Sequence, residues 1–119
     1  MKIGIIGFGG IGERHFRNIR ENFPKFQIRI LSKRGDIPFD KNTEVFHKAK
    51  DFFNIQTDIF FITNKTTEHA ETILECLKYS PKAIFVEKPL SHSLKNIELI
   101  RKIINKKKVI FFVGYCLQF

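Results

Sequence analysis

A glycine-rich turn near the N-terminus most constrains how this chain can fold. An apolar run, residues 1–6, leads into Gly7-Phe8-Gly9-Gly10-Ile11-Gly12, which fits the pattern G-x-G-x-x-G, and a helical pattern follows at 12–21. A strand, a glycine turn and a helix start in this order are the context of a dinucleotide-binding fingerprint. The alternative is an incidental glycine turn, since such turns are common.

Each glycine of the fingerprint has a physical task. Gly7 permits the tight turn that leaves the strand, and Gly12 allows the helix to pack closely on that strand. Gly9 has no Cβ, so a pyrophosphate can approach the backbone, where unpaired N–H groups and the helix dipole favour an anion. We therefore expect the whole turn to bind the cofactor, namely Gly7, Phe8, Gly9, Gly10, Ile11 and Gly12.

Strands and helices alternate along the rest of the chain. Helical patterns separate most of the apolar runs that follow the first one, and these runs lie at 26–31, 44–46, 57–63, 82–86 and 109–113. Such alternation is typical of right-handed βαβ crossovers and a parallel sheet. The expected fold class is therefore α/β, a Rossmann-type doubly wound parallel sheet of about six strands in the order 3-2-1-4-5-6, with helices on both faces.

Two local expectations concern the helices. Thr66 or Thr67 is placed to cap the helix that follows the fourth strand. The first helix is expected to bury one face made of residues at a spacing of four, namely Ile11, His15, Ile19 and Phe23.

Length and charge restrict the possible classes of protein. A chain of 119 residues suits one domain, and the net charge of +9 raises the question of nucleic acid binding. The one dense basic run, Lys106 to Lys108, lies where a helix should end, and cations are favourable there. Because aromatic residues are not interleaved with the basic ones, we expect a solvated face and no nucleic acid partner.

Compartment and metal chemistry are only weakly indicated. No apolar run approaches the roughly 20 residues that span a bilayer, and no signal-peptide layout precedes the first strand, so we expect a cytoplasmic protein without membrane contact. Cys76 and Cys116 make no disulfide framework. We expect no metal site.

The end of the second strand indicates which dinucleotide binds. An acidic residue about 20 positions after the fingerprint would bind the ribose 2′-hydroxyl of NAD. Here Ser32, Lys33 and Arg34 occupy this region, and Asp36 lies beyond the expected contact point. A hydroxyl, an ammonium and a guanidinium fork suit a 2′-phosphate, so NADP is favoured over NAD. The alternative is that Lys33 and Arg34 are exposed loop charges.

Three further stretches, taken with the fingerprint, resemble a known family. They are Ile-Thr-Asn-Lys-Thr-Thr-Glu-His at 62–69, Glu-Lys-Pro at 87–89, and Val-Gly-Tyr-Cys-Leu-Gln-Phe at 113–119. Together they resemble the nucleotide-binding half of the Gfo/Idh/MocA oxidoreductases, the glucose–fructose oxidoreductase and inositol dehydrogenase family. The resemblance implies hydride transfer between a nicotinamide and a carbinol or keto carbon of a sugar or cyclitol.

The resemblance also implies roles for particular residues. Thr63, Asn64 and His69 would lie on the cofactor side of the fourth strand, and Glu87 and Lys88 at the nicotinamide end. Lys88 would touch both substrate and cofactor and is the candidate catalytic residue. All follow the carboxyl ends of strands, where ligands bind in open α/β sheets. The alternatives are an exposed lysine or a local ion pair for Lys88, and a structural hydrogen bond for His69.

The expectation about activity depends on two differences from the family pattern and on the length of the chain. Many members carry Thr-Pro where this chain has Thr63-Asn64, and an Arg where Gln118 stands. Members continue into a substrate domain after the junction at which residues 1–119 stop. We expect an NAD(P)-binding domain that is not catalytically complete alone; the alternative is a non-catalytic dinucleotide-binding or interaction module. The apolar segment 109–119 is expected to support homo-oligomers.

Overall fold

A six-stranded parallel sheet forms the centre of the molecule. The structure, a computed structural model, describes residues 1–37, 40–88 and 96–114. The strands lie in the order β3-β2-β1-β4-β5-β6, and every neighbouring pair is parallel. The predicted fold class, strand number and strand order are confirmed. The register brings the ends of the three central strands level, because Ile6 of β1 pairs with Leu31 of β2 and with Ile62 of β4.

The elements follow the predicted alternation, with shifts of a few residues at their ends. The strands are β1 (Lys2–Ile6), β2 (Gln27–Leu31), β3 (Thr43–Phe46), β4 (Ile59–Ile62), β5 (Ala83–Glu87) and β6 (Ile110–Gly114). The helices are α1 (Gly10–Asn22), α2 (Ala49–Phe53), the 3-10 turn η1 (Thr66–Glu68), α3 (His69–Leu77) and α4 (Ile97–Lys107).

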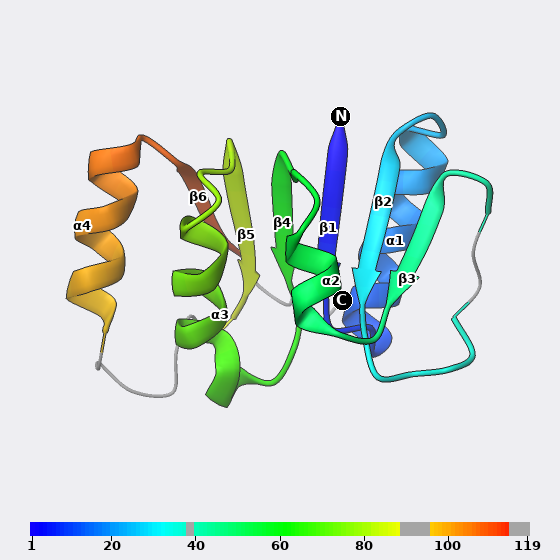
Figure 1. The fold of residues 1–119 in the computed structure, drawn as a ribbon, viewed down its shortest axis with the longest axis horizontal. Helices are drawn as coiled ribbons and strands as arrows, with labels where there is room; N and C mark the ends of the chain where they lie inside the picture. The colour runs from blue at the N-terminus through cyan, green and yellow to red at the C-terminus, as the bar shows by residue number, and fades with distance from the viewer. Residues whose placement is uncertain (38–39, 89–95, 115–119) are drawn as a thin grey trace.

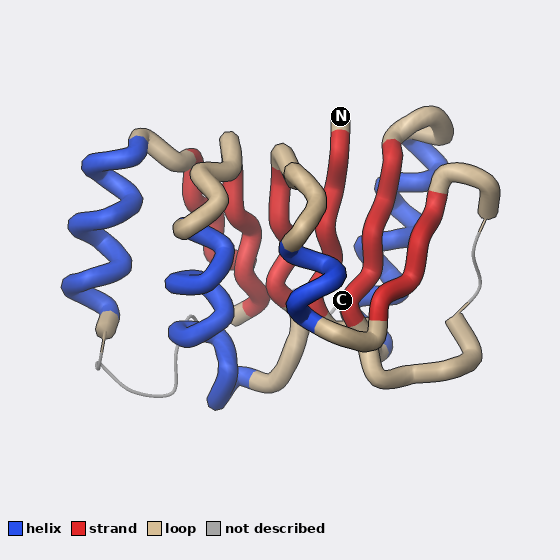
Figure 2. Tube along the Cα trace, viewed as in Figure 1, coloured by secondary structure: helices blue, strands red, loops and turns tan. Residues whose placement is uncertain are grey.

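The helices divide unequally between the two faces of the sheet. Helix α1 covers one face beside β1 and β2, whereas α2, α3 and α4 lie along the other face (Figures 1 and 2). Alternate strand residues supply the two cores: Ile5 and Ile30 pack with Phe16 of α1, and Ile62 and Ile84 pack with the helices opposite. Burial on both faces explains why these strands are continuous apolar runs.

Helix α1 buries a face that overlaps the predicted one and is offset from it by one residue. Gly12 and Phe16 are its buried residues, whereas Ile11, His15 and Ile19 are half-buried. Phe23 is 50% exposed and stacks on Phe26. A helix turns once every 3.6 residues, so a spacing of four drifts by about 40° at each step and cannot stay on one face.

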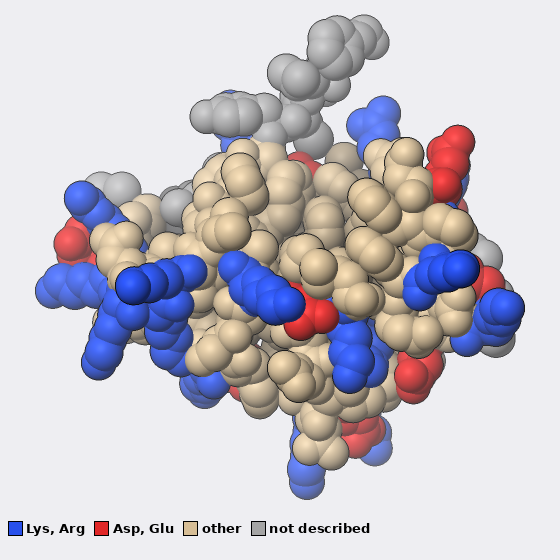
Figure 3. All heavy atoms as spheres, turned by 90° about the horizontal axis from the view of Figure 1, so that it is seen from above, with Lys and Arg blue, Asp and Glu red and all other residues tan. Residues whose placement is uncertain are grey.

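Basic residues are spread over the face shown in Figure 3 and are densest at its left, the end of the molecule that carries α4. Lys106 and Lys107 lie in its last turn. The Lys107 ammonium donates to the Leu77 carbonyl oxygen (2.7 Å), so this lysine satisfies the end of α3. Within the described ranges, no helix is long and apolar enough to cross a bilayer.

The start of α1 packs on the end of β1 with no room for a side chain. A Cβ added at Gly12 would stand 2.4 Å from the Gly7 carbonyl oxygen, and one at Gly7 would stand 2.6 Å from the Asn64 Cα. Gly7 also has a φ of +90°, a conformation that favours glycine. Gly10, in the same turn, has open space around it. The predicted tasks of Gly7 and Gly12 are confirmed.

We expect Gly12→Ala to lower the free energy of unfolding by about 2–4 kcal/mol, because its Cβ would collide with backbone that cannot move independently. Gly10→Ala is the matched control in the same turn. It should leave stability unchanged or raise it by up to about 1 kcal/mol, because alanine favours the helix. Urea denaturation of both variants measures this. Equal effects of the two substitutions would contradict the packing argument.

Candidate functional site

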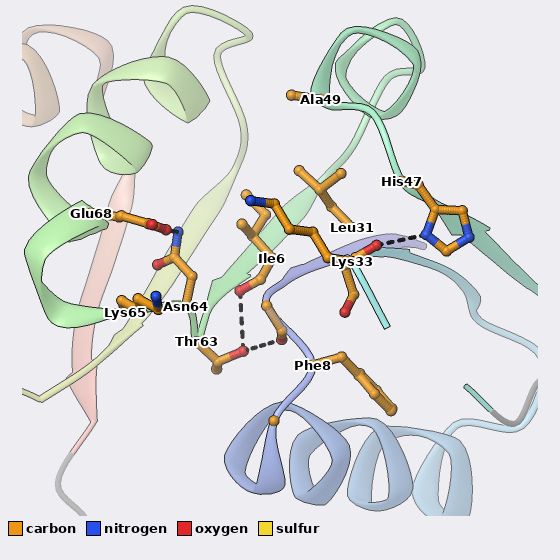
Figure 4. Close-up of a pocket in the computed structure, with 13 residues that line it drawn as sticks. Ile6, Phe8, Leu31, Lys33, His47, Ala49, Thr63, Asn64, Lys65 and Glu68 are labelled. Atoms are coloured by element: carbon orange, nitrogen blue, oxygen red, sulfur yellow. Dashed lines mark hydrogen bonds between the residues drawn. The ribbon is translucent and has the colours of Figure 1, made fainter. Parts of the chain in front are cut away.

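A cavity of about 610 Å³ opens at the carboxyl ends of the central strands. Its walls come from four places: the glycine turn, the end of β2, the segment between β3 and α2, and the end of β4 (Figure 4). The lining residues are Ile6, Gly7, Phe8, Gly9, Leu31, Ser32, Lys33, His47, Ala49, Thr63, Asn64, Lys65 and Glu68. This is the edge at which the strand order reverses, where ligands bind in open α/β sheets.

The glycine turn is held by bonds from both neighbouring strands. The Gly7 amide donates to the Leu31 carbonyl oxygen (2.9 Å). The Thr63 hydroxyl lies 2.6 Å from the Gly7 carbonyl oxygen and 3.2 Å from that of Ile6. Thr63 therefore fixes the turn from β4, and its hydroxyl is used within the protein.

The next part of the turn leaves backbone open to a ligand. A Cβ at Gly9 or at Gly10 would meet nothing within 4 Å. Gly9 has extended backbone (φ −85°), which any residue can adopt, so neither sterics nor conformation explains a glycine there. It lines the cavity directly before α1. A dinucleotide pyrophosphate fits this arrangement, because it needs close access to backbone N–H groups at a helix start.

The three residues that follow β2, Ser32, Lys33 and Arg34, do not all line the cavity. Ser32 and Lys33 line the cavity, and in Figure 4 the Lys33 side chain reaches across the enclosed space. Arg34 instead lies over the Phe8 ring, 5.5 Å from its centroid, and donates to the Phe8 carbonyl oxygen (2.9 Å). Its guanidinium also pairs with Asp36 (3.0 Å). The hydrogen bond from Arg34 holds the pKa of Asp36 below its usual value.

The end of β4 is tied to the helix behind it. The Asn64 amide nitrogen donates to Thr72 (2.9 Å) and Glu68 (3.3 Å). His69 is only 1% exposed, and its Nε2 lies 3.0 Å from the Asn64 carbonyl oxygen. His69 is thus part of the packing beneath the loop and is not among the residues that line the cavity.

The predicted cap at Thr66 or Thr67 is wrong. Thr66–Glu68 forms a 3-10 turn, and α3 begins one step later, at His69, without a side-chain cap.

The end of β5 contacts helix α1. A carboxylate oxygen of Glu87 lies 2.7 Å from His15 Nε2, within hydrogen-bond distance, and both residues are half-buried. The His15 ring packs against Phe61 and Phe85, with centroids 5.3 and 5.0 Å apart. Lys88 follows, and its amide donates to the Gly114 carbonyl oxygen (3.0 Å). Neither Glu87 nor Lys88 lines the cavity. Pro89 and Gln118 lie outside the described residues.

Six lining residues were not predicted as site residues from the sequence, namely Ile6, Leu31, His47, Ala49, Lys65 and Glu68. His47 contacts the end of β2, because its Nδ1 lies 2.8 Å from the Ser32 carbonyl oxygen. The only available signal was position: His47 directly follows β3, another strand that ends at this edge. Among the described residues, no three His, Cys, Asp or Glu side chains are grouped to hold a metal ion.

Comparison with known proteins places the chain in a family. The model of the GFO_IDH_MocA family, described as an oxidoreductase family with an NAD-binding Rossmann fold, matches residues 1–115. The chain belongs to this family. The resemblance inferred from the fingerprint and the Glu87-Lys88-Pro89 stretch is confirmed.

Individual relatives of the Gfo/Idh/MocA family are longer. A myo-inositol 2-dehydrogenase of Thermotoga maritima is 30% identical over all of this chain and 37% of its own length. The chain thus spans little more than a third of this curated relative. A Synechocystis biliverdin reductase in complex with biliverdin and NADP+ has a TM-score of 0.77 and 14% identity, over 95% of this chain and 37% of its own.

A second solved structure holds the other dinucleotide. The WlbA dehydrogenase of Chromobacterium violaceum, in complex with NADH and UDP-GlcNAcA, has a TM-score of 0.77 and 17% identity, over 96% of this chain and 34% of its own. The two structures share the fold with this chain and differ in cofactor, so the likeness does not discriminate NAD from NADP.

The Thr63 hydroxyl gives a testable feature of this site. Thr63→Val keeps the shape of the side chain and removes the bond to the Gly7 carbonyl oxygen, so we expect a loss of about 1–2 kcal/mol in the free energy of unfolding. The exposed Thr67 offers the control, because Thr67→Val should change stability by less than about 0.5 kcal/mol. Urea denaturation compares them, and a Thr63→Val variant as stable as wild type would refute the role of this bond.

Proposed function

We propose that the cavity binds NADP in preference to NAD, and that the chain is the nucleotide-binding part of an oxidoreductase acting on a sugar or cyclitol. The observation that carries the dinucleotide proposal is the open backbone at Gly9 and Gly10, at a helix start beside the cavity. The chain's membership of the family supports it.

Within this proposal the pyrophosphate would lie against the glycine turn, where backbone N–H groups donate to it. Ile11 and Gly12 belong to the first turn of α1 and would hold that helix end in place. Thr63 and Asn64 would bound the opposite side through the backbone, since their side chains bond within the protein. His69 would act only by supporting this loop.

The preference for NADP rests on the residues after β2. The Lys33 ammonium lies in the cavity beside Ser32, and the Arg34 guanidinium lies next to the glycine turn. The two cations would attract a 2′-phosphate from two sides. No carboxylate is among the cavity-lining residues at the end of β2, where one would favour a ribose 2′-hydroxyl.

The proposed reaction takes place at the end of β5. Bound NADP would supply hydride chemistry, and Lys88 would donate to the reacting oxygen of a keto or carbinol carbon. His15 would hold the Glu87 side chain beneath it. The myo-inositol 2-dehydrogenase relative, of which this chain spans little more than a third, supports a cyclitol or sugar as the substrate.

An alternative is a dinucleotide-binding or interaction module without turnover of its own. The exposed apolar residues of β6 favour it: Ile110 is 57% and Phe112 59% exposed on one face of this edge strand. Such a surface suits association with a second polypeptide or a second copy of this chain.

Titration tests the dinucleotide site. We expect NADPH and NADH both to bind, with NADPH the tighter, as measured by nicotinamide fluorescence. Gly9→Ala should weaken both by about tenfold or more, because its Cβ would occupy the space of the pyrophosphate, while the fold stays intact. The control Gly35→Ala also has open space for its Cβ and lies outside the cavity wall, so NADH binding should be unchanged. Full NADH binding by Gly9→Ala would contradict this site.

Turnover separates the two candidate functions. NADPH oxidation with inososes and other keto-sugars supports the enzyme, and it should fall by about 10²-fold or more in Lys88→Met. NADPH binding should weaken far less than turnover in that variant, because the glycine turn still binds the cofactor. Lys82→Met, at the opposite end of β5, is the matched control. Binding without turnover supports the module, and turnover that survives Lys88→Met excludes Lys88 as the catalytic residue.

A further inference from the structure

The guanidinium of Arg34 is already occupied by groups of its own chain. Its Nε and Nη2 donate to the two carboxylate oxygens of Asp36, at 3.0 and 3.3 Å. Its Nη1 donates to the Phe8 carbonyl oxygen (2.9 Å) and lies 3.5 Å from a carboxylate oxygen of Glu13. A guanidinium binds a phosphate through the same fork of N–H groups. Asp36 therefore fills the fork that a 2′-phosphate would use.

Lys33 and Arg34 consequently differ in how they can respond to a ligand. Lys33 lines the cavity, so its ammonium can contact an anion there without a change of position. Arg34 must first exchange its carboxylate partner for the incoming phosphate. This exchange is feasible because the Asp36 side chain is 79% exposed and the Arg34 side chain 37%, and exposed ion pairs are worth little.

Glu13 is the weaker of the two acidic partners. It lies in the first turn of α1 and pairs chiefly with Arg17, at 3.0 Å. The pKa of its carboxyl is lowered first by Arg17 and only secondarily by Arg34. Glu13 therefore helps to hold Arg34 against the glycine turn, whereas Asp36 occupies the fork.

We propose that Asp36 is a specificity-determining residue: its carboxylate stands in for a 2′-phosphate on Arg34 and reduces the preference for NADP over NAD. The inference rests on the proposed dinucleotide site and adds a regulator of its selectivity. NAD binds while the Arg34–Asp36 pair stays closed. NADP binds through Lys33 and Ser32, and gains the Arg34 fork only by displacing Asp36.

A double-mutant cycle tests this with the chain as it is. NADP+ and NAD+ are titrated calorimetrically against wild type, Asp36→Asn, Arg34→Ala and the double variant, at about 0.1 M salt, where long-range charge effects are screened beyond about 10 Å. Asp36→Asn should strengthen NADP+ binding about three- to tenfold and change NAD+ binding less than about twofold. In the Arg34→Ala background, Asp36→Asn should change neither the NADP+ affinity nor the NAD+ affinity by more than about twofold.

Two controls separate the fork from general charge effects. Asp36→Glu keeps the carboxylate, so its ratio of NADP+ affinity to NAD+ affinity should stay near that of the wild type. Asp51→Asn removes one negative charge from the exposed surface of α2 and should also keep that ratio.

The outcomes are distinct. An unchanged NADP+ to NAD+ ratio in Asp36→Asn, or an equal gain with and without Arg34, overturns the role of Asp36 and leaves the dinucleotide site standing. Failure of wild type to bind either dinucleotide overturns the proposed function, and this inference with it.

Discussion

The contact between the first turn of α1 and the ends of β1 and β4 is the constraint on which the rest of this structure depends. Gly12 lies against the Gly7 carbonyl oxygen, at a separation that leaves no room for a Cβ, and the Thr63 hydroxyl bonds to that same oxygen. Because the three segments meet without intervening side chains, the helix start is held at the edge of the sheet. The cavity opens at this edge, and its glycine wall is rigid for the same reason.

Helix α1 then connects this turn to two more distant segments. Glu13 and the Phe8 carbonyl hold Arg34, which follows β2, and His15 holds Glu87 at the end of β5. The helix and the turn before it thereby hold side chains at the ends of two strands, β2 and β5. A change in the packing of α1 would move the candidate phosphate-binding and nicotinamide ends of the site together, so affinity and any catalysis should be coupled through this helix.

Sequence patterns predicted the sheet well and the side-chain environments less well. The parallel sheet followed from apolar runs that alternate with helices, and the strand order followed from the glycine fingerprint on the first of six strands. The buried face of α1 is offset by one residue from the predicted one, and the cap at Thr66 or Thr67 was wrong. A local pattern cannot show which segments the fold brings against a helix, such as the strands that pack on α1.

The sequence by itself determined the fold class, the strand order and the place of the glycine turn, because these depend on hydrophobic period and on residues without a Cβ. Only the tertiary structure decided which groups each charged residue after β2 contacts. Lys33 lines the cavity, whereas Arg34 lies over Phe8 with Asp36 in its fork. It also paired His15 with Glu87 across 72 positions of the chain. Side chains that can rotate take partners according to which segments the fold brings within reach, and adjacency in the sequence does not contain that information.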